Sequence, residues 1–327
     1  MHKVAPLTLL LCSTAVPCAA LAADAASAYP DKPVRFLVLS PPGGGSDITA
    51  RAIAQKLTEK WGQQVIADTR AGAGGVVGME IAAKARPDGY TLVLGGIGPV
   101  AVAPSLYAKP PYDPVKDFTP VVRAANALNL LVVHPSLPVN SVKELIAYAK
   151  TPGAKLNYGS SGAGRADHLS GEIFNRMTGI SMQHVPYKGG APAMIDLLGG
   201  NIQLIFATVS TAIVHVKSGK IRPLGMTSAK RSEFFPDIPT IAESGVPGFA
   251  VDNWYGVVGP VGIPRPIVTK AHRDISDALT QRDVKERLVA LGIVAFPTAT
   301  PEEFGAYIKS EVSRYSKLVK EAGITAE

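Results

Sequence analysis

Short apolar runs alternate along the chain with stretches in which apolar residues recur every three or four positions. The first pattern is typical of buried strands and the second of amphipathic helices. Their alternation predicts an α/β fold with largely parallel sheets. The nine predicted strands are Val34–Leu39, Gln64–Asp68, Thr91–Gly95, Leu130–His134, Leu156–Gly159, Gln183–Val185, Gln203–Ala207, Ile221–Thr227 and Gly256–Gly259.

Helix signals fall between these strands. Ser141 is followed three residues later by Glu144, and Thr300 by Glu303, which predicts a capping box at the start of each of two helices. Residues 266–291 predict one helix or two. The helix after the first strand carries one apolar stripe, made of Ala50, Ile53, Ala54, Leu57 and Trp61.

The first residues have the pattern of a secretory signal peptide. Lys3 gives a positive start, residues 4–21 are mostly apolar, and small residues precede a cleavage point after Ala22. Ala26-Ser27-Ala28 offers a second cleavage point. We expect residues 1–22 to be removed and the protein to be exported. Both cysteines of the chain lie in this segment, so the mature protein is expected to carry no thiol chemistry.

Two proline-rich runs, 104–120 and 236–264, mark the only shifts in composition. They are consistent with a middle domain inserted into the first one. The expected domains are residues 23–126 with 252–327, and residues 127–251. Two lobes joined by short crossing segments are typical of hinge-closing binding proteins.

Composition and charge narrow the class of protein. A chain of 327 residues is long enough for about two domains. Its 46% hydrophobic and 18% charged residues exclude a disordered tail protein. The net charge of +7 is spread along the chain rather than gathered in a basic block. We therefore expect no nucleic-acid partner.

Three segments share one design, in which a strand ends in a glycine-rich turn that leads into a helix. Glycine allows the positive φ and the close backbone approach that such turns need. The N–H groups of the following helix start are unpaired and carry partial positive charge, which favours an anion. The three turns are Ser40–Asp47, Tyr158–Gly164 and Val185–Gly190. We expect them to line an anion site at the carboxyl ends of the strands.

Phosphate and metal chemistry do not fit these residues. No lysine follows Gly43-Gly44-Gly45-Ser46-Asp47, so the turn is not a nucleotide P-loop, and Asp47 is expected to cap its own helix. The six histidines show no pairing at four-residue spacing, so no metal and no cofactor are predicted.

The sequence contains no clear nucleophile and base for catalysis. The pattern Gly-x-Ser-x-Gly is absent. Asp167 and His168 are neighbours on a helix and do not face each other. His168 is therefore expected to hydrogen-bond to its loop and fix it.

Several motifs, taken in their order along the chain, resemble one family. They are Tyr29–Arg35, Pro42–Asp47, Arg86–Leu92, Gly159–Gly162 with His168-Leu169, Val185–Gly189, Asp196–Gly200, Pro236–Thr240 and Trp254–Gly256. Over essentially the whole mature chain, the sequence is similar to the Bug family of periplasmic solute-binding proteins. These are the receptors of tripartite tricarboxylate transporters.

The resemblance implies a two-lobed α/β clamshell, each lobe a mostly parallel sheet flanked by helices, with no enzymatic activity. It implies a periplasmic monomer that binds a small organic acid and passes it to the membrane permease of the transporter. Carried over by position, the ligand-binding residues are Gly43, Gly44, Gly45, Ser46, Asp47, Gly98, Ser160, Ser161, Gly164, Arg165, His168, Tyr187, Ala207 and Trp254.

Departures from the family pattern bear on the ligand. Arg165 stands where members of the family often have serine or threonine. Its guanidinium either makes paired hydrogen bonds to a second carboxylate or lies in solvent. Ala207 stands where acidic residues are frequent, which disfavours an amino acid. A dicarboxylate or an aromatic acid is thus the expected ligand. Two alternatives stay open: a hydrolase or transferase that uses Ser160 or Ser161 on a carboxylate ester, and a ligand sensor for a two-component system.

Overall fold

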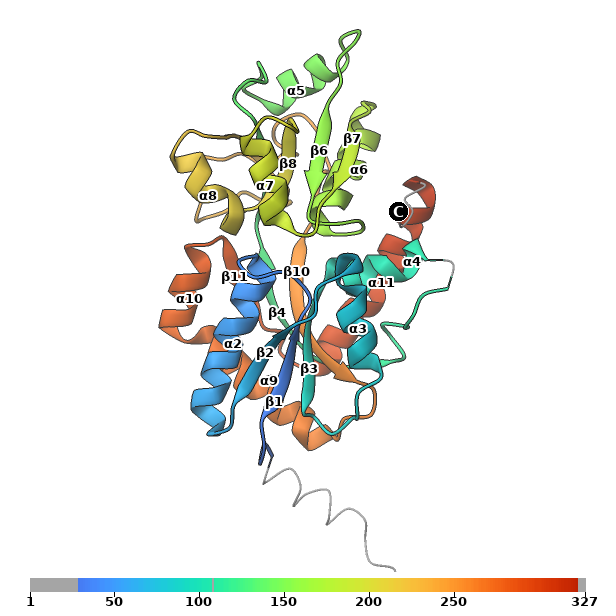
Figure 1. The fold of residues 1–327 in the computed structure, drawn as a ribbon, viewed down its shortest axis with the longest axis vertical. Helices are drawn as coiled ribbons and strands as arrows, with labels where there is room; N and C mark the ends of the chain where they lie inside the picture. Colours follow the sequence, from blue (N-terminus) through green and yellow to red (C-terminus); the bar gives the residue numbers. More distant parts are fainter. Residues whose placement is uncertain (1–28, 108, 323–327) are drawn as a thin grey trace, which may run out of the picture.

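The computed structural model describes residues 29–107 and 109–322, which form two lobes built on two sheets (Figure 1). The predicted signal peptide lies outside the described residues. Strands of the first lobe are β1 (Val34–Val38), β2 (Val65–Thr69), β3 (Thr91–Gly96), β4 (Phe118–Ala127), β10 (Asn253–Pro260) and β11 (Ile293–Ala295). Strands of the second lobe are β5 (Asn129–Val133), β6 (Asn157–Ser160), β7 (Gln183–Pro186), β8 (Leu204–Thr208) and β9 (Arg222–Met226).

Helices cover both faces of each sheet. In the first lobe they are α2 (Gly45–Trp61), α3 (Val76–Ala83), α4 (Ala103–Leu106), α9 (Arg265–Thr280), α10 (Arg282–Val289) and α11 (Pro301–Ala322), with a 3₁₀ turn η1 (Ala73–Gly75) and a π-helical turn η2 (Ile97–Val102). In the second lobe they are α5 (Val142–Ala149), α6 (Ala166–Thr178), α7 (Gly190–Leu198) and α8 (Val209–Lys217). Within the described residues, none of these helices has the length and apolar character to cross a membrane.

Both sheets are mixed, with most strands of each running in one direction, so the expected two-lobed α/β fold is confirmed. The first has the order β11-β4-β10-β3-β1-β2, and β10 runs antiparallel to both of its neighbours. The second has the order β7-β6-β8-β5-β9, and β5 runs antiparallel to β8 and β9. The physical reason is the connection between the lobes. A strand that leaves a lobe and a strand that returns to it run in opposite directions when they pair.

The chain passes between the lobes twice. Leu128 alone separates β4 from β5, and residues 227–252 separate β9 from β10. The two passages are tied together, because Asn253 Nδ2 donates a hydrogen bond to Asn129 Oδ1 at 3.1 Å. The domain limits expected from sequence, 126/127 and 251/252, fall beside these passages. Figure 1 shows the second lobe, in green to yellow, stacked on the first.

The core is built on both faces of each sheet. In β1, Phe36 packs toward α2 and α9, whereas Leu37 packs toward α3 and α11. In the second lobe, one cluster lies beneath α5 and α6 and another beneath α7 and α8. Strands buried on two faces explain why the apolar runs are continuous rather than alternating. The sheets therefore hold their strand ends rigidly at the junction of the lobes.

All nine predicted strands are confirmed, and two strands were not predicted. β4 contains Pro120 and overlaps a proline-rich run, and β11 has only three residues. β11 is an edge strand of the first sheet and β4 lies next to it. Proline is tolerated near the edge of a sheet. The predicted cap at Ser141 is confirmed, since its Oγ accepts from the N–H of Glu144 at 3.2 Å. The Glu144 carboxylate accepts from the N–H of Asn140, one residue before the cap.

Candidate functional site

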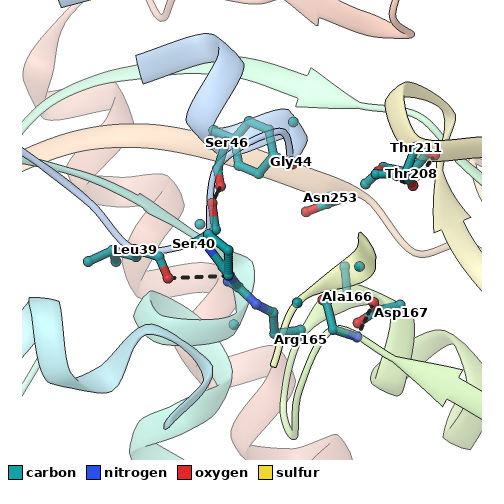
Figure 2. A pocket seen from close by; sticks show the side chains of 18 of the residues that line it. Leu39, Ser40, Gly44, Ser46, Arg165, Ala166, Asp167, Thr208, Thr211 and Asn253 are labelled. Atoms are coloured by element: carbon teal, nitrogen blue, oxygen red, sulfur yellow. Dashed lines mark hydrogen bonds between the residues drawn. The ribbon is translucent and has the colours of Figure 1, made fainter. Parts of the chain in front are cut away.

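A cavity of about 100 Å³ lies between the two sheets (Figure 2). Its wall in the first lobe comes from the turn after β1, the turn after β3 and the start of β10. The second lobe supplies the turns after β6, β7 and β8. The main polar members of the lining are Ser40, Ser46, Asn129, Ser161, Arg165, Asp167, Thr208, Thr211, Asn253 and Tyr255.

Four helices begin at this cavity. Gly45 of α2, Ala166 of α6, Gly190 of α7 and Thr208, the residue before α8, all belong to its lining. Each helix start directs unpaired N–H groups and partial positive charge toward the space that they share. The three glycine turns singled out in the sequence therefore converge, as expected, and the turn into α8 is added to them.

Two of the four helix starts already carry a carboxylate of the protein. Asp47 in the first turn of α2 accepts from the N–H of Gly43 at 3.0 Å. Asp167 in the first turn of α6 accepts from the N–H of Ser161 at 2.6 Å. Burial raises the pKa of the Asp167 carboxyl. The first turns of α7 and α8 contain no acidic residue, so their positive ends face the cavity without a carboxylate of their own.

Arg165 lies in the wall of the cavity rather than in solvent. It is the residue before α6, and its Nη2 donates to the main-chain carbonyl of Leu39 in the other lobe at 3.4 Å (Figure 2). Arg165 and Asp167 are the only charged side chains among the described residues of the lining. The site thus holds one guanidinium next to one buried carboxyl.

Neutral polar groups make up the rest of the wall. Ser40 and Ser46 share a hydrogen bond of 2.5 Å, and Thr208 and Thr211 share one of 3.1 Å. Burial raises the pKa of the Tyr255 hydroxyl to about 12, so the group stays protonated and can donate a hydrogen bond. The cavity can therefore surround a small anion with hydroxyl, amide and N–H donors.

The residues predicted from sequence fall into three sets. Those in the lining are Gly44, Gly45, Ser46, Gly98, Ser161, Arg165 and Ala207. Those that support the turns from behind are Gly43, Asp47, Ser160, Gly164 and His168. Asp47 does not occupy the cap position expected for it, because α2 begins two residues earlier. The N–H of Gly164 donates to Nδ1 of His168 at 2.9 Å, which confirms that this histidine fixes its loop.

Tyr187 and Trp254 lie outside the lining, contrary to the expectation. Trp254 is fully buried in the core beside Phe304, and its Nε1 donates to Glu311 Oε2 at 2.9 Å. The hydroxyl of Tyr187 donates to Asp196 Oδ2 at 2.6 Å. In each case the polar end of the ring donates to a carboxylate of its own lobe.

Sequence reasoning missed several polar members of the lining: Asn129, Asp167, Thr208, Thr211 and Asn253. Thr208 ends β8 and precedes α8, so it repeats the design of the other turns without their glycines. A signal for this site was therefore present in the sequence: a residue with a hydroxyl group where a strand ends and a helix begins. The two asparagines are the first residues of β5 and β10, directly after the passages between the lobes, and sequence spacing alone does not bring them together.

A serine and a histidine do meet near the cavity. Ser160 Oγ lies 2.7 Å from Nε2 of His184, but Ser160 is fully buried and outside the lining. The described part of the lining contains no histidine that could act as a base for Ser161. Nor do the described residues contain a group of three or more side chains suited to a metal ion.

The comparisons with known proteins agree with this geometry. Residues 49–324 match the family described as "Tripartite tricarboxylate transporter family receptor". The chain belongs to this receptor family. Protein BugT of Bordetella pertussis is 37% identical over 300 residues, which is 91% of each chain. The family is one of binding receptors and not of enzymes.

Solved structures of the family superpose over nearly the whole chain. The R. palustris protein Rpa4515, solved with adipate, is 38% identical, has a TM-score of 0.86 and covers 91% of this chain and 99% of its own. The periplasmic binding protein BugD is 35% identical, with a TM-score of 0.85 and the same coverage. MatC of Rhodopseudomonas palustris, solved with malate, is 32% identical, with a TM-score of 0.83 and coverage of 89% and 100%. The receptor described here therefore shares the fold of periplasmic binding proteins.

Proposed function

We propose that this receptor binds a small dicarboxylate or aromatic acid in the cavity between its lobes and delivers it to a membrane permease. The observation that carries the proposal is the convergence of four helix starts and Arg165 on one cavity. Helix starts and a guanidinium both favour negative charge. The ligand is therefore an anion.

The positions of the protein's own carboxylates indicate where that anion lies. Asp47 and Asp167 already accept hydrogen bonds at the starts of α2 and α6. The starts of α7 and α8, beside Thr208 and Thr211, carry no carboxylate of the protein, so a carboxylate of the ligand meets no like charge there. A second acidic group is held by Arg165. The two sites suit a ligand with polar groups at both ends.

The volume of the cavity limits the size of the ligand. The cavity is small, about 100 Å³, so a short diacid or a single-ring aromatic acid is the expected ligand. The relatives solved with adipate and malate support a ligand of the same class for this chain.

Binding is expected to close the lobes around the acid. Closure expels water, which strengthens each hydrogen bond to the carboxylate because the local dielectric falls. The lobes already approach each other at the turns, where Arg165 reaches Leu39. We further propose that the chain is exported with removal of residues 1–22 and acts as a monomer in the periplasm.

A panel of ligands tests the proposal on the mature protein. Thermal unfolding is measured with succinate, adipate, benzoate, nicotinate, citrate, aspartate and a diamine, and calorimetry follows for each compound that raises the unfolding temperature. We expect at least one diacid or aromatic acid to bind and the diamine not to bind. Binding of the diamine alone, or of none of the acids, would contradict the proposal.

A further inference from the structure

Two histidines lie face to face behind the cavity. The rings of His168 on α6 and His184 on β7 have centroids 3.9 Å apart and planes inclined by 16°. His168 is nearly inaccessible, with 5% of its surface exposed. The turn made of residues 160–165, from the last residue of β6 to the residue before α6, is hydrogen-bonded to the pair, and its members Ser161 and Arg165 line the cavity.

Hydrogen bonds attach this turn to both rings. His168 Nδ1 accepts from the N–H of Gly164 at 2.9 Å, and His184 Nε2 lies 2.7 Å from Ser160 Oγ. Ser160 Oγ also accepts from the N–H of Gly162 at 3.2 Å. Ser160 and Gly164 are therefore hydrogen-bonded to the two rings, and Gly162 is linked to them through Ser160. The arrangement requires that Nδ1 of His168 carry no proton.

The surroundings of His168 oppose its protonation. A charge on either ring would face the other ring at van der Waals distance, in a buried place. The ionisable groups that face His168 in the described residues are Asp167 and Glu172 on α6, Tyr158 on β6 and His184 on β7, while on α11 Glu321 pairs with Arg176 at the far end of α6. Glu172 is 3.9 Å from His168 Nε2 and also accepts from the Tyr158 hydroxyl, so it is shared.

We propose that the His168–His184 pair positions the turn 160–165 for the ligand and makes that position sensitive to pH. When His168 is neutral, the turn is fixed and presents Ser161 and Arg165 to the cavity. When His168 is protonated, the N–H of Gly164 loses its acceptor and the turn is released. This inference rests on the proposed function, because the turn belongs to the proposed ligand site.

The direction of the pH effect follows from the two states of the turn. Burial, and then the neighbouring His184, lower the pKa of His168 to about 3. A released turn exposes the ring, which then titrates near its ordinary value of about 6.5. Between these two values only the released form takes up a proton. Each unit of pH below about 6.5 therefore favours release by up to tenfold.

Two variants and two measurements test the pair. His168→Asn places an amide oxygen where Nδ1 accepts and cannot titrate, whereas His168→Leu removes the acceptor. Hydrogen exchange of the segment 160–165, corrected for intrinsic rates, is measured without ligand at pH 7.5 and 5.5. We expect protection in the unsubstituted protein to fall about tenfold at pH 5.5, to stay constant in His168→Asn and to be low at both pH values in His168→Leu.

Calorimetry with adipate then measures the coupling to binding. The affinity of the unsubstituted protein relative to His168→Asn is expected to fall severalfold between pH 7.5 and 5.5, and protonation of adipate itself cancels in this ratio. Equal protection at both pH values, or parallel pH profiles of the two proteins, would overturn the inference. If adipate binds neither protein, hydrogen exchange still decides on the pair, and the failure counts against the proposed ligand alone.

Discussion

The guanidinium of Arg165 in the second lobe lies 3.4 Å from the main-chain carbonyl oxygen of Leu39 in the first. A single side chain therefore lines the cavity and also connects its two walls. Leu39 directly follows β1, and Arg165 directly precedes α6, so both partners are positioned by neighbouring regular structure. This geometry links ligand charge to the closed arrangement of the lobes, and it leads to the first two predictions.

Arg165→Ser is expected to weaken binding of a dicarboxylate by about tenfold to a hundredfold, because a charge-assisted hydrogen bond contributes about 1.5–3 kcal/mol. Binding of a monocarboxylate should change little. Calorimetry with matched mono- and diacids checks this. Arg282→Ser, at a largely exposed arginine of α10 that pairs with Glu286, is the control. An equal loss of affinity for both acids would show that Arg165 does not bind the second carboxylate.

Gly98→Ala is expected to hinder closure of the lobes. A Cβ at Gly98 would lie 3.1 Å from the carbonyl oxygen of Gly164 and 3.3 Å from Cα of Arg165, both in the opposite lobe. The affinity should fall while the thermal unfolding temperature of the unliganded protein stays nearly unchanged. Gly199→Ala, where the added atom would have ordinary contacts, serves as the control. Unchanged affinity in Gly98→Ala would mean that the bound lobes stand further apart.

Thr208→Val tests the hydroxyl cluster before α8. Thr208 Oγ1 accepts from Ser210 Oγ at 3.1 Å and lines the cavity. Loss of a hydrogen bond from this hydroxyl to the ligand carboxylate, about 1.5–3 kcal/mol, should weaken acid binding by about tenfold to a hundredfold. The matched control is Thr178→Val, whose hydroxyl donates to the carbonyl of Phe174 within its own helix. The proposed position of the ligand carboxylate is refuted if the two variants bind equally well.

Asp274→Asn is expected to destabilise the first lobe by about 1.5–3 kcal/mol, since it removes the buried charge that accepts hydrogen bonds from partly exposed cations. The Asp274 side chain is fully buried and accepts from Trp61, with Lys60 and Lys270 both within 3.0 Å. Burial by itself would raise the pKa of the Asp274 carboxyl, but these donors lower it on balance. A thermal unfolding measurement at pH 7 checks the difference.

The pH dependence of that difference has a definite sign. A carboxyl whose pKa is lowered by folding stabilises the protein above its unfolded value of about 4 and loses this effect as the pH falls below it. The gap between the unsubstituted protein and Asp274→Asn should therefore shrink below about pH 4. Asp277→Asn, at the exposed partner of the same Lys60, should cost far less at every pH. A constant gap down to pH 3 would argue against the network.

Local signals accounted for most of the elements. The apolar runs located nine strands because strands buried on both faces need side chains such as Phe36 and Leu37 at successive positions. The caps at Ser141 and Thr300 also follow from short-range hydrogen bonds. β4 was not predicted because proline has no N–H to donate to a neighbouring strand. Pro120 is tolerated only where the ladder needs no donor, and this depends on the place of the strand in the sheet.

The sequence by itself determined the three glycine turns and the helix starts behind them, because these depend on residues only a few positions apart. Only the tertiary structure decided which turns meet, that Asn129 and Asn253 join them, and that Trp254 faces the core. It also decided that His168 stacks on His184, sixteen residues further along the chain. The physical reason is that strand direction and sheet order are set by pairing between distant segments, and a site at the junction of two sheets inherits that order.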